Sequence, residues 1–331
     1  MILRRNSPKL VLIGASLLTG LLVSELALRL AGFEFHLRPE RITFAWKNSL
    51  ASLGYQGDRD LLWVPAGYAQ RLAAARAERP LIAFLGDSCT EYSKYPDLLL
   101  HNLAGRRPGV RWTGVSLGTA GWSSLQGLRQ LRRDVLPLRP RVVTVYFGWN
   151  DHWIGFGLPD EEIAALLQRT SAFWQQVRLA QLGHKAYIAV RGSRENRRVP
   201  LPAFRRNLHE IVRLARSHGI EPVLVTAPSS HQRGREPRYL AKHWVARLED
   251  LVPLHQQYVN AVRAVAAEDE AVLCDLAGKF ASLRPARRDA SFRPDGIHLT
   301  ERGARTVAKQ LADCLEDAGV LDRVLAAEAA R

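Results

Sequence analysis

Short apolar runs that alternate with amphipathic stretches constrain the fold of this 331-residue chain more than any other feature. The clearest run, residues 141–147, reads RVVTVYF between Pro140 and Gly148 and is rich in β-branched side chains. A continuous apolar strand of this kind is typical of a parallel sheet covered by helices on both faces. We expect further strands at residues 80–85, 111–117, 222–228 and 271–276. We expect helices at residues 95–103, 123–136, 202–217, 243–267 and 300–318, which together predict an α/β fold.

The N-terminal segment is typical of a signal peptide or a signal anchor. Three basic residues precede an apolar stretch at 10–23, which continues as SELALRLAG to residue 32. The uninterrupted part is shorter than the ~20 residues of a spanning helix, so the span must include Glu25 and reach Arg29. These two residues are four apart and can pair on one helix face. Because no convincing small-x-small cleavage site follows, we expect an uncleaved anchor with its basic end in the cytoplasm.

Two other segments lie outside the alternation of strands and helices. Residues 160–198 are mostly helical in pattern, and we interpret them as an insertion or lid rather than a second domain. The stretch before the first strand has no sustained period, and we interpret it as a stem that packs on the domain through Trp46, Tyr55 and Trp63. The expected division is a cytoplasmic N-terminus at 1–8, a transmembrane anchor at 9–31, the stem at 32–78, one domain at 79–320 and a tail at 321–331.

The charge balance is strongly basic, with 47 Lys and Arg against 32 Asp and Glu, for a formal charge of +15. Such a charge suits nucleic acid, an anionic membrane surface or an acidic polymer. No basic run is interleaved with aromatic residues, and the arginines are scattered along the whole chain. Nucleic acid is therefore not expected as a partner.

Three cysteines are too few and too far apart for a disulfide framework or a structural zinc site. A bridge between Cys274 and Cys314 is one alternative, although a buried free thiol is the commoner state of such residues. The histidines show no ligand cluster in the sequence. We therefore expect no metal and no other cofactor.

Four polar clusters follow the expected strands or precede the last helix. They are GDS at 86–88, GTAG at 118–121, GWND at 148–151 and DGIH at 295–298. In an open α/β sheet, ligands bind beyond the carboxyl ends of the strands. The four clusters are therefore expected to meet at one site.

These clusters contain the residue types that nucleophilic catalysis needs. A serine hydroxyl such as Ser88 is a poor nucleophile until an imidazole takes its proton, and His298 can do this. Asp295, three residues earlier, is placed to fix the tautomer of that imidazole. The backbone amides of Ser88 and Gly118, with the side-chain amide of Asn150, would supply an oxyanion hole.

The clusters, in this order, resemble the SGNH/GDSL hydrolase superfamily over residues 80–314. The resemblance implies a flavodoxin-like, three-layer α/β/α fold with a five-stranded parallel sheet in the order 2-1-3-4-5. It also implies esterase, lipase, thioesterase or carbohydrate acetylesterase activity, with Ser88 as nucleophile, Gly118 and Asn150 as oxyanion donors, and Asp295 and His298 as the acid–base pair. One departure is Ser116, where many relatives carry Asn. An anchor followed by a DLLW stem at 60–63 is also similar to bacterial members linked to cell-surface polysaccharides.

We therefore expect a serine hydrolase that cleaves carboxylic esters of cell-surface polysaccharide or lipid, with O-acetyl groups of polysaccharide as the first choice. Its expected location is the bacterial inner membrane, with the catalytic domain on the periplasmic or extracellular side. One alternative is an O-acetyltransferase of polysaccharide assembly that uses the same residues. Another is a non-catalytic scaffold with the same fold. The sequence does not predict the oligomeric state.

Several neighbours of the clusters have two interpretations. Asp87 is expected to hydrogen-bond structurally rather than to serve as the acid of the site, and Asp151 to brace its loop. Cys89 is expected to be a packed thiol rather than a nucleophile. For His152 and His231, the alternatives are an ordinary surface position or contact with substrate. Three tryptophans could form a substrate-binding rim or pack in the core: Trp122, Trp149 and Trp153.

Overall fold

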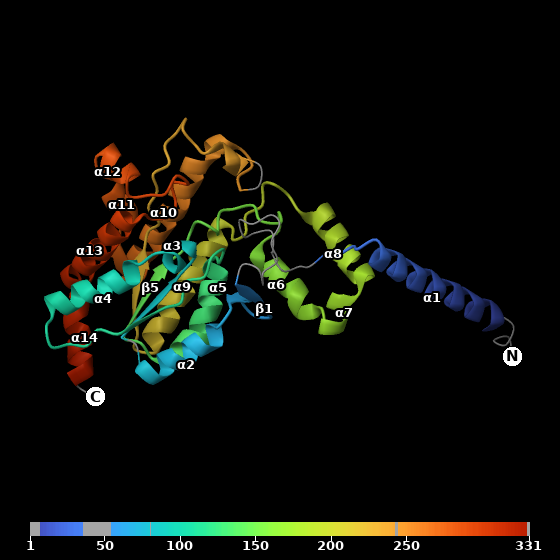
Figure 1. The fold of residues 1–331 in the computed structure, drawn as a ribbon, viewed down its shortest axis with the longest axis horizontal. Helices are drawn as coiled ribbons and strands as arrows, with labels where there is room; N and C mark the ends of the chain where they lie inside the picture. Colours follow the sequence, from blue (N-terminus) through green and yellow to red (C-terminus); the bar gives the residue numbers. More distant parts are fainter. Residues whose placement is uncertain (1–6, 36–53, 80, 242–243, 330–331) are drawn as a thin grey trace.

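The sheet at the centre of the protein has five parallel strands (Figure 1). A computed structural model describes residues 7–35, 54–79, 81–241 and 244–329. The strands are β3 (Ile82–Gly86), β4 (Gly114–Ser116), β5 (Val142–Tyr146), β6 (Glu221–Val225) and β7 (Val272–Cys274). Their spatial order is β4-β3-β5-β6-β7, which is the predicted 2-1-3-4-5 when the strands of this sheet are counted along the chain. The flavodoxin-like topology is thus confirmed.

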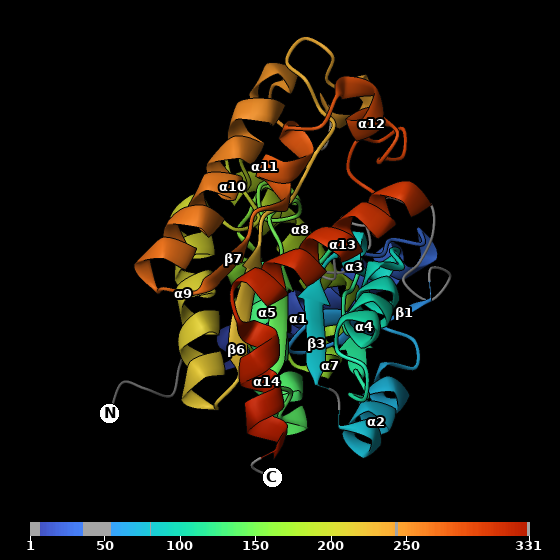
Figure 2. The same ribbon diagram turned by 90° about the vertical axis from the view of Figure 1, so that its left-hand side faces the viewer.

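Helices cover both faces of the sheet because its strands are apolar on both faces. In β3, Ala83 and Leu85 belong to one apolar core, whereas Ile82 and Phe84 belong to the other. The first core is closed by α2 (Tyr68–Glu78), α5 (Ser124–Gln130), α9 (Leu201–Ser217) and α10 (Leu251–Glu268). The second core is closed by α4 (Tyr95–Arg106), α13 (Glu301–Asp317) and α14 (Val320–Ala329), which lie in front of the sheet in Figure 2.

Two of the expected helices differ most from the observed ones, and α4 ends three residues later than expected, at Arg106. The helix expected at 123–136 is divided into α5, a π-helical turn (Leu131–Val135) and a 3-10 turn (Leu136–Leu138), which contains a proline. The helix expected from residue 243 begins only at Leu251, after a short 3-10 turn (Leu248–Asp250), and position 243 itself lies outside the described residues. The other short helices are α3 (Ser88–Glu91), α11 (Leu276–Ala281), α12 (Pro285–Asp289) and a 3-10 turn (Arg238–Ala241).

The described part of the stem contains an antiparallel hairpin, β1 (Tyr55–Asp58) with β2 (Leu62–Pro65), followed by α2, and both pack into the first core. Tyr55 and Trp63 are buried, as predicted, whereas Trp46 lies outside the described residues. The Trp63 indole donates to the carbonyl oxygen of Ala120, and the Trp122 indole donates back to that of Trp63. These bonds fasten the hairpin to the loop that follows β4.

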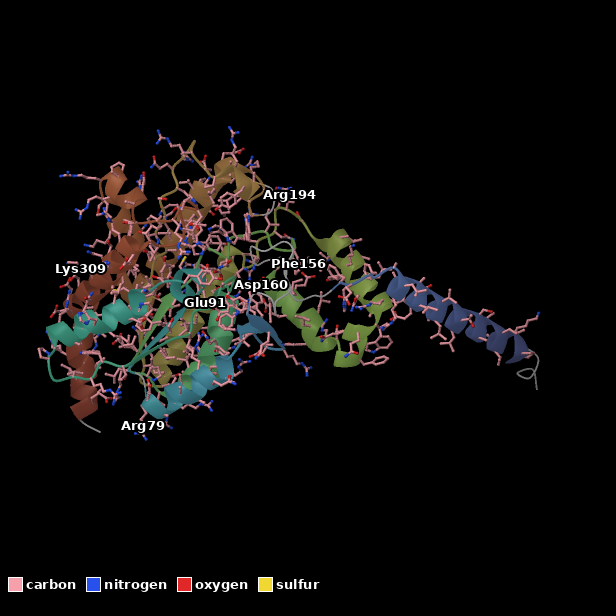
Figure 3. All side chains as sticks on the ribbon, viewed as in Figure 1. Arg79, Glu91, Phe156, Asp160, Arg194 and Lys309 are labelled. Carbon is pink, nitrogen blue, oxygen red and sulfur yellow. A yellow bond between two sulfur atoms is a disulfide. The ribbon has the colours of Figure 1, made fainter. Side chains whose placement is uncertain are left out.

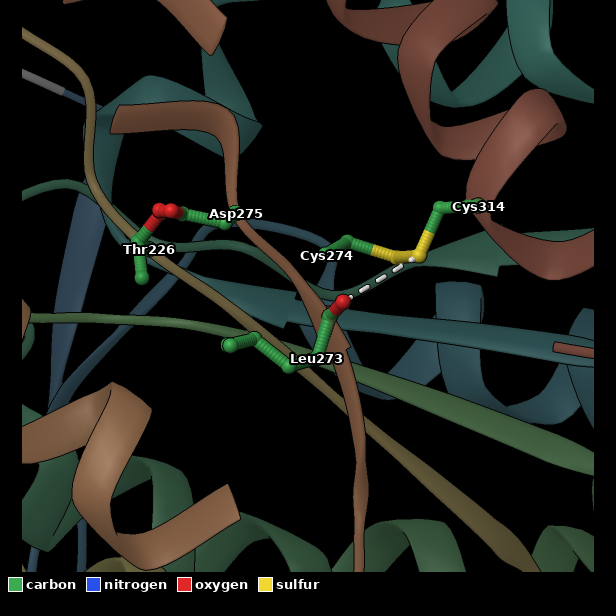
Figure 4. Close-up of a disulfide and its surroundings, with 5 residues drawn as sticks. All are labelled: Thr226, Leu273, Cys274, Asp275 and Cys314. Atoms are coloured by element: carbon green, nitrogen blue, oxygen red, sulfur yellow. Dashed lines mark hydrogen bonds between the residues drawn. A yellow bond between two sulfur atoms is a disulfide. The ribbon is translucent and has the colours of Figure 1, made fainter. Parts of the chain in front are cut away.

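Cys274 and Cys314 form a disulfide, which corrects the expectation of buried free thiols. The bridge ties the end of β7 to α13 across 40 residues of sequence (Figure 4). The two cysteines are brought together because α13 packs along β7 at the edge of the sheet, a contact between segments far apart in the chain. Cys89 is a buried free thiol, as expected.

The N-terminal helix α1 (Ser7–Leu30) projects away from the domain (Figure 1). Among the described residues it is the one helix that is long and apolar enough to cross a membrane, over Pro8–Leu30. Glu25 and Arg29 form the expected ion pair near its C-terminal end. The insertion folds as α6 (Asp160–Arg169), α7 (Ala172–Gln176) and α8 (Arg178–Arg191), and Figure 1 places these helices between the sheet and α1.

Candidate active site

Ser88 lies at the carboxyl end of β3, where the chain turns directly into the short helix α3. Asp87 begins this helix, and its carboxylate accepts a hydrogen bond from the backbone amide of Cys89 at 2.9 Å. Ser88 is therefore the first helical residue, and its own amide belongs to the turn whose N–H groups have no acceptor within the helix. The Ser88 side chain is held at the edge of the sheet by a short, well-capped turn.

A second turn brings Asp295 and His298 to the same place. The Asp295 Oδ1 atom accepts from the amides of Ile297 and His298, both at 2.8 Å, so that the carboxylate closes the turn on itself. Gly296 has φ +74°, a left-handed backbone conformation that glycine adopts without the strain a side chain would add. The DGIH turn thus holds the Asp295 carboxylate against the His298 ring, and the His298 ring against Ser88.

The three side chains form one continuous hydrogen-bonded chain. His298 Nε2 lies 2.8 Å from Ser88 Oγ, and His298 Nδ1 lies 2.9 Å from Asp295 Oδ2. Since a carboxylate can only accept, Nδ1 carries the proton and Nε2 is left to accept from the serine hydroxyl. Ser88 and His298 are nearly buried, with 4% and 9% of their surface exposed.

The environment keeps the Asp295 carboxyl ionised. Partial burial acts to raise the pKa of Asp295, but hydrogen bonds from the His298 ring and from the amides of His298 and Ile297 outweigh it, and the pKa is lowered from its usual value. An ionised carboxylate at this position stabilises an imidazolium on the neighbouring ring.

Asn150 and Gly118 lie beside this chain, each at the end of a neighbouring strand. The Asn150 side chain donates to Asp87 Oδ2 at 3.1 Å, so Asp87 links α3 to the loop after β5. Asp87 is therefore a structural hydrogen-bonding residue, as expected. A Cβ atom added at Gly118 would lie 2.6 Å from Thr90 Cβ and 2.9 Å from the Glu91 amide nitrogen, so only glycine allows this approach to α3.

Two residues that the sequence analysis did not single out complete the surroundings of Ser88. The Glu91 carboxylate is mostly buried and accepts from the Ala120 amide at 2.6 Å and from the Tyr55 hydroxyl at 2.7 Å. Burial raises the pKa of Glu91. Tyr92 is half exposed, and its ring centre lies 5.9 Å from that of His298. Glu91 and Tyr92 follow Ser88 by three and four residues, which is one helical turn, and this spacing was the signal in the sequence that they lie beside it.

Of the two histidines near the site, His152 differs from both expected alternatives. His152 is fully buried and lies 3.2 Å from His255, rather than at the surface or against substrate. Burial lowers the pKa of His152 well below its usual value and that of His255 to about 3, so both rings are neutral. His231 is partly buried, and its Nε2 lies 2.7 Å from the Asp295 carbonyl oxygen, so it supports the DGIH turn.

The tryptophans are core residues, and the alternative of a binding rim is not supported. Trp149 is 2% exposed and stacks on the His255 ring with 3.8 Å between ring centres. Trp153 packs against Trp149, and Trp122 is fully buried beside the hairpin. Within the described ranges, no group of three or more His, Cys, Asp or Glu side chains could hold a metal ion.

The insertion is joined to the loops of the site by a buried ion pair. Arg198, at its end, makes two hydrogen bonds to the Asp160 carboxylate at its start, at 2.9 and 2.8 Å. The same guanidinium donates to the Gly121 carbonyl oxygen. The backbone amide of Val199 donates to the carbonyl oxygen of Asp151. The two ends of the insertion are therefore fixed to the loops that carry Gly118 and Asn150.

A Ser–His–Asp chain at the carboxyl edge of a 2-1-3-4-5 parallel sheet defines the class of SGNH hydrolases. The sequence model of the GDSL-like lipase/acylhydrolase family matches residues 84–306, and the chain belongs to this family. It is an ester-hydrolysing enzyme. No curated protein matches the chain.

Several solved structures are similar to the protein at low sequence identity. A lipase/acylhydrolase from Enterococcus faecalis is 18% identical, with 71% of this chain and 95% of that chain covered and a TM-score of 0.49. A GDSL-like lipase from Bacteroides thetaiotaomicron is 17% identical, with 76% and 98% covered and a TM-score of 0.49. An acetylxylan esterase from Geobacillus stearothermophilus is 16% identical, with 71% and 93% covered and a TM-score of 0.47.

Proposed function

We propose that the enzyme cleaves carboxylic esters through an acyl-enzyme on Ser88, with His298 as general base and Asp295 as its partner. The observation that carries this proposal is the continuous chain of hydrogen bonds, 2.8 Å from serine to histidine and 2.9 Å from histidine to aspartate. A hydroxyl becomes a nucleophile when an imidazole within hydrogen-bond reach removes its proton.

In the first half-reaction, Ser88 Oγ attacks the carbonyl carbon of the ester while its proton passes to His298 Nε2. Asp295 stabilises the resulting imidazolium through Nδ1. The tetrahedral intermediate then collapses, and the imidazolium gives its proton to the departing alcohol oxygen. In the second half, His298 takes a proton from water as the water oxygen attacks the acyl carbon. The bond to Ser88 Oγ then breaks, the imidazolium returns its proton to that oxygen, and the carboxylic acid leaves.

The negative charge on the carbonyl oxygen needs donors that are already in place. We assign this role to the amides of Ser88 and Gly118 and to the side-chain amide of Asn150. One N–H of the Asn150 amide is bound to Asp87, which orients the group and leaves its second N–H for the oxyanion. Gly118 supports the assignment because its backbone packs directly against the turn that carries Ser88.

We propose that the substrate lies at or outside the membrane, with O-acetyl groups of cell-surface polysaccharide as the first choice and lipid esters as the second. Helix α1 supports a single-pass anchor in the bacterial inner membrane with the domain on the periplasmic or extracellular side. The Cys274–Cys314 disulfide supports the same side, because disulfides persist in oxidising compartments. The formal charge of +15 suits an anionic polymer or anionic lipid.

The test is a panel of chromogenic esters from acetyl to palmitoyl, measured on the wild type, Ser88→Ala and the control Ser282→Ala, which removes an exposed serine after α11. We expect Ser88→Ala to lose at least ~10³-fold in kcat/KM and the control to lose nothing. Hydrolysis that survives in folded Ser88→Ala would overturn the assignment.

The same proteins can separate the two alternatives. A fluorophosphonate probe should label the wild type and Ser282→Ala but not Ser88→Ala. Failure to label folded wild type would favour a non-catalytic scaffold. If acetyl groups passed to an added glycan faster than to water, the enzyme would be an O-acetyltransferase using the same acyl-enzyme.

A further inference from the structure

The outer end of α1 is fastened to the joint between α7 and α8. The Glu25 carboxylate accepts from the backbone amides of Arg178 and Leu179, at 3.1 and 2.9 Å, which are first-turn donors of α8. Arg29 donates to the carbonyl oxygen of Gln176, the last residue of α7. The anchor helix therefore satisfies groups at both helix ends of this joint. The joint between α7 and α8 is therefore held at a fixed position along the axis of α1, next to Glu25.

The depth of this joint in a bilayer can be estimated from the length of α1. At 1.5 Å per residue, residues 10–24 of α1, between Lys9 and Glu25, are about 22 Å long. The hydrocarbon core of a bilayer is ~30 Å thick, and a shorter span is accommodated by local thinning and by snorkelling of its flanking residues. Glu25 then lies at the border between the hydrocarbon and the headgroups. Because Glu25 binds the first turn of α8, α7 and the start of α8 lie at the same depth.

The side chains at this depth are of the kind that bilayer interfaces favour. Phe173 and Trp174 on α7 are 68% and 55% exposed, although they are large and apolar. Leu182 and Val190 on α8 are also exposed, at 41% and 83%. Tryptophan and other aromatic residues are enriched at the level of the headgroups, where an apolar ring and a polar edge are both satisfied.

The charge of α8 fits a phospholipid surface. The helix has no acidic residue and carries Lys185, Arg191 and Arg178, of which Arg178 pairs with Glu34. A helix with exposed apolar side chains and only basic charges lies in the interface plane, with its cations near lipid phosphates. A water-facing position would leave the four exposed apolar side chains without a function or a cover.

We propose that α7 and α8 form a membrane-binding surface on the phospholipid leaflet from which α1 emerges, with Phe173 and Trp174 inserted at the polar–apolar border. The inference rests on the proposal that α1 spans a membrane. The Asp160–Arg198 pair and the bond to Gly121 join this surface to the loops of the site. The active site is thereby held close to the bilayer rather than extended from it on a stem.

The experiment uses the full chain reconstituted in vesicles of phosphatidylethanolamine and phosphatidylglycerol. A single cysteine carrying an environment-sensitive fluorophore is introduced by Trp174→Cys, and two controls are Leu17→Cys in α1 and Lys309→Cys. Lys309 is exposed on α13, on the far side of the domain from the insertion (Figure 3). Native cysteines do not interfere, since Cys89 is buried and the other two are bridged.

Quenching by nitroxide lipids and by aqueous iodide then reports where each label lies. We expect the label at 174 to be quenched by a shallow nitroxide and to be several-fold less accessible to iodide than the label at 309. A label at 174 as accessible to iodide as that at 309 would overturn the inference. A label shielded from iodide but not quenched by lipid would also overturn it, in favour of a protein partner such as a second copy of the chain.

The control in α1 separates this inference from the anchor on which it rests. Deep nitroxide quenching at 17 together with an exposed label at 174 would refute the membrane-binding surface alone. Absence of lipid quenching at 17 would refute the span itself and the inference with it. As a further check, Phe173→Ser/Trp174→Ser should raise iodide access to a label at Leu182→Cys several-fold and leave hydrolysis of a water-soluble acetyl ester unchanged.

Discussion

The buried ion pair between Asp160 and Arg198 gives a prediction whose size follows from its geometry. The two side chains are 2% and 0% exposed and share two hydrogen bonds, and Asp160 also accepts from the Ser123 hydroxyl at 2.8 Å. Asp160→Asn keeps the shape and removes the charge, which leaves a guanidinium buried without its counter-ion. Breaking a buried pair in this way costs about 3–5 kcal/mol in the free energy of unfolding.

A double substitution distinguishes the cost of leaving the Arg198 charge without a counter-ion from the loss of the ion-pair attraction itself. Asp160→Asn/Arg198→Met removes both charges, and apolar replacement of a buried pair is often close to neutral. The Gly121 carbonyl then loses its donor, at a cost of about 1–3 kcal/mol. We therefore expect the double variant to be more stable than Asp160→Asn, although less stable than the wild type.

The assay is thermal and urea unfolding of the full chain in detergent, followed by intrinsic fluorescence. Asp160→Asn should lower Tm by on the order of 10 °C for a domain of this size. The matched control is Glu301→Gln, which breaks an i,i+4 pair whose side chains are 71% and 65% exposed and should cost under ~0.5 kcal/mol. If Asp160→Asn cost no more than this control, or if the double variant were no more stable than Asp160→Asn, the reasoning would be refuted.

Three further predictions concern other buried or bonded groups. Burial raises the pKa of Asp151 to about 7, so the folded chain binds a proton that the unfolded chain has lost, and stability falls as pH rises from about 4 to about 7. Asp151→Asn should remove this dependence and gain about 4 kcal/mol in unfolding free energy relative to the wild type across that window, measured by urea titrations. Parallel plots of unfolding free energy against pH for the two proteins would contradict it. Replacing Cys274 and Cys314 by serine should cost about 4 kcal/mol by the chain-entropy estimate, and reduction of the wild type should reproduce that loss of Tm. Asp295→Asn should lower kcat by about 10²–10⁴-fold with little change in KM. A comparable rise in KM would point to substrate binding instead. Because the pKa of Asp295 is lowered, its titration should not reduce wild-type activity above about pH 4.

Much of the fold was accessible from the sequence because its determinants are local. The run at 141–147 is buried on both faces and forms β5, and the alternation of apolar and amphipathic segments gave five strands in the predicted order. The candidate site residues could be proposed from local clusters as well. Ser88 follows the end of β3, Gly118 and Asn150 follow the ends of β4 and β5, and the parallel arrangement brings those ends to one edge. Asp295 and His298 lie in the loop before α13 instead, and their signal was the DGIH cluster itself. Ser88, His298 and Asp295 accordingly meet within hydrogen-bond distance.

What the sequence did not predict depends on contacts between distant segments. The Cys274–Cys314 bridge needs α13 to pack along β7, and no spacing in the sequence reports that contact. His152 was misplaced because a polar residue after a strand is usually exposed, whereas here His255 and the Trp149 ring enclose it. The role of Glu25 in capping α8, 153 positions away, has no local signature at all.

The hairpin of β1 and β2 has a practical consequence for making this enzyme in soluble form. Trp63 is fully buried, exchanges hydrogen bonds with the Ala120–Trp122 segment, and belongs to the same core as the sheet. A truncated protein that began at residue 79 would expose the Trp122 face and leave Glu91 without the Tyr55 hydroxyl. Removal of the anchor for expression should therefore stop short of Tyr55, so that the recombinant enzyme retains the hairpin as part of its catalytic unit.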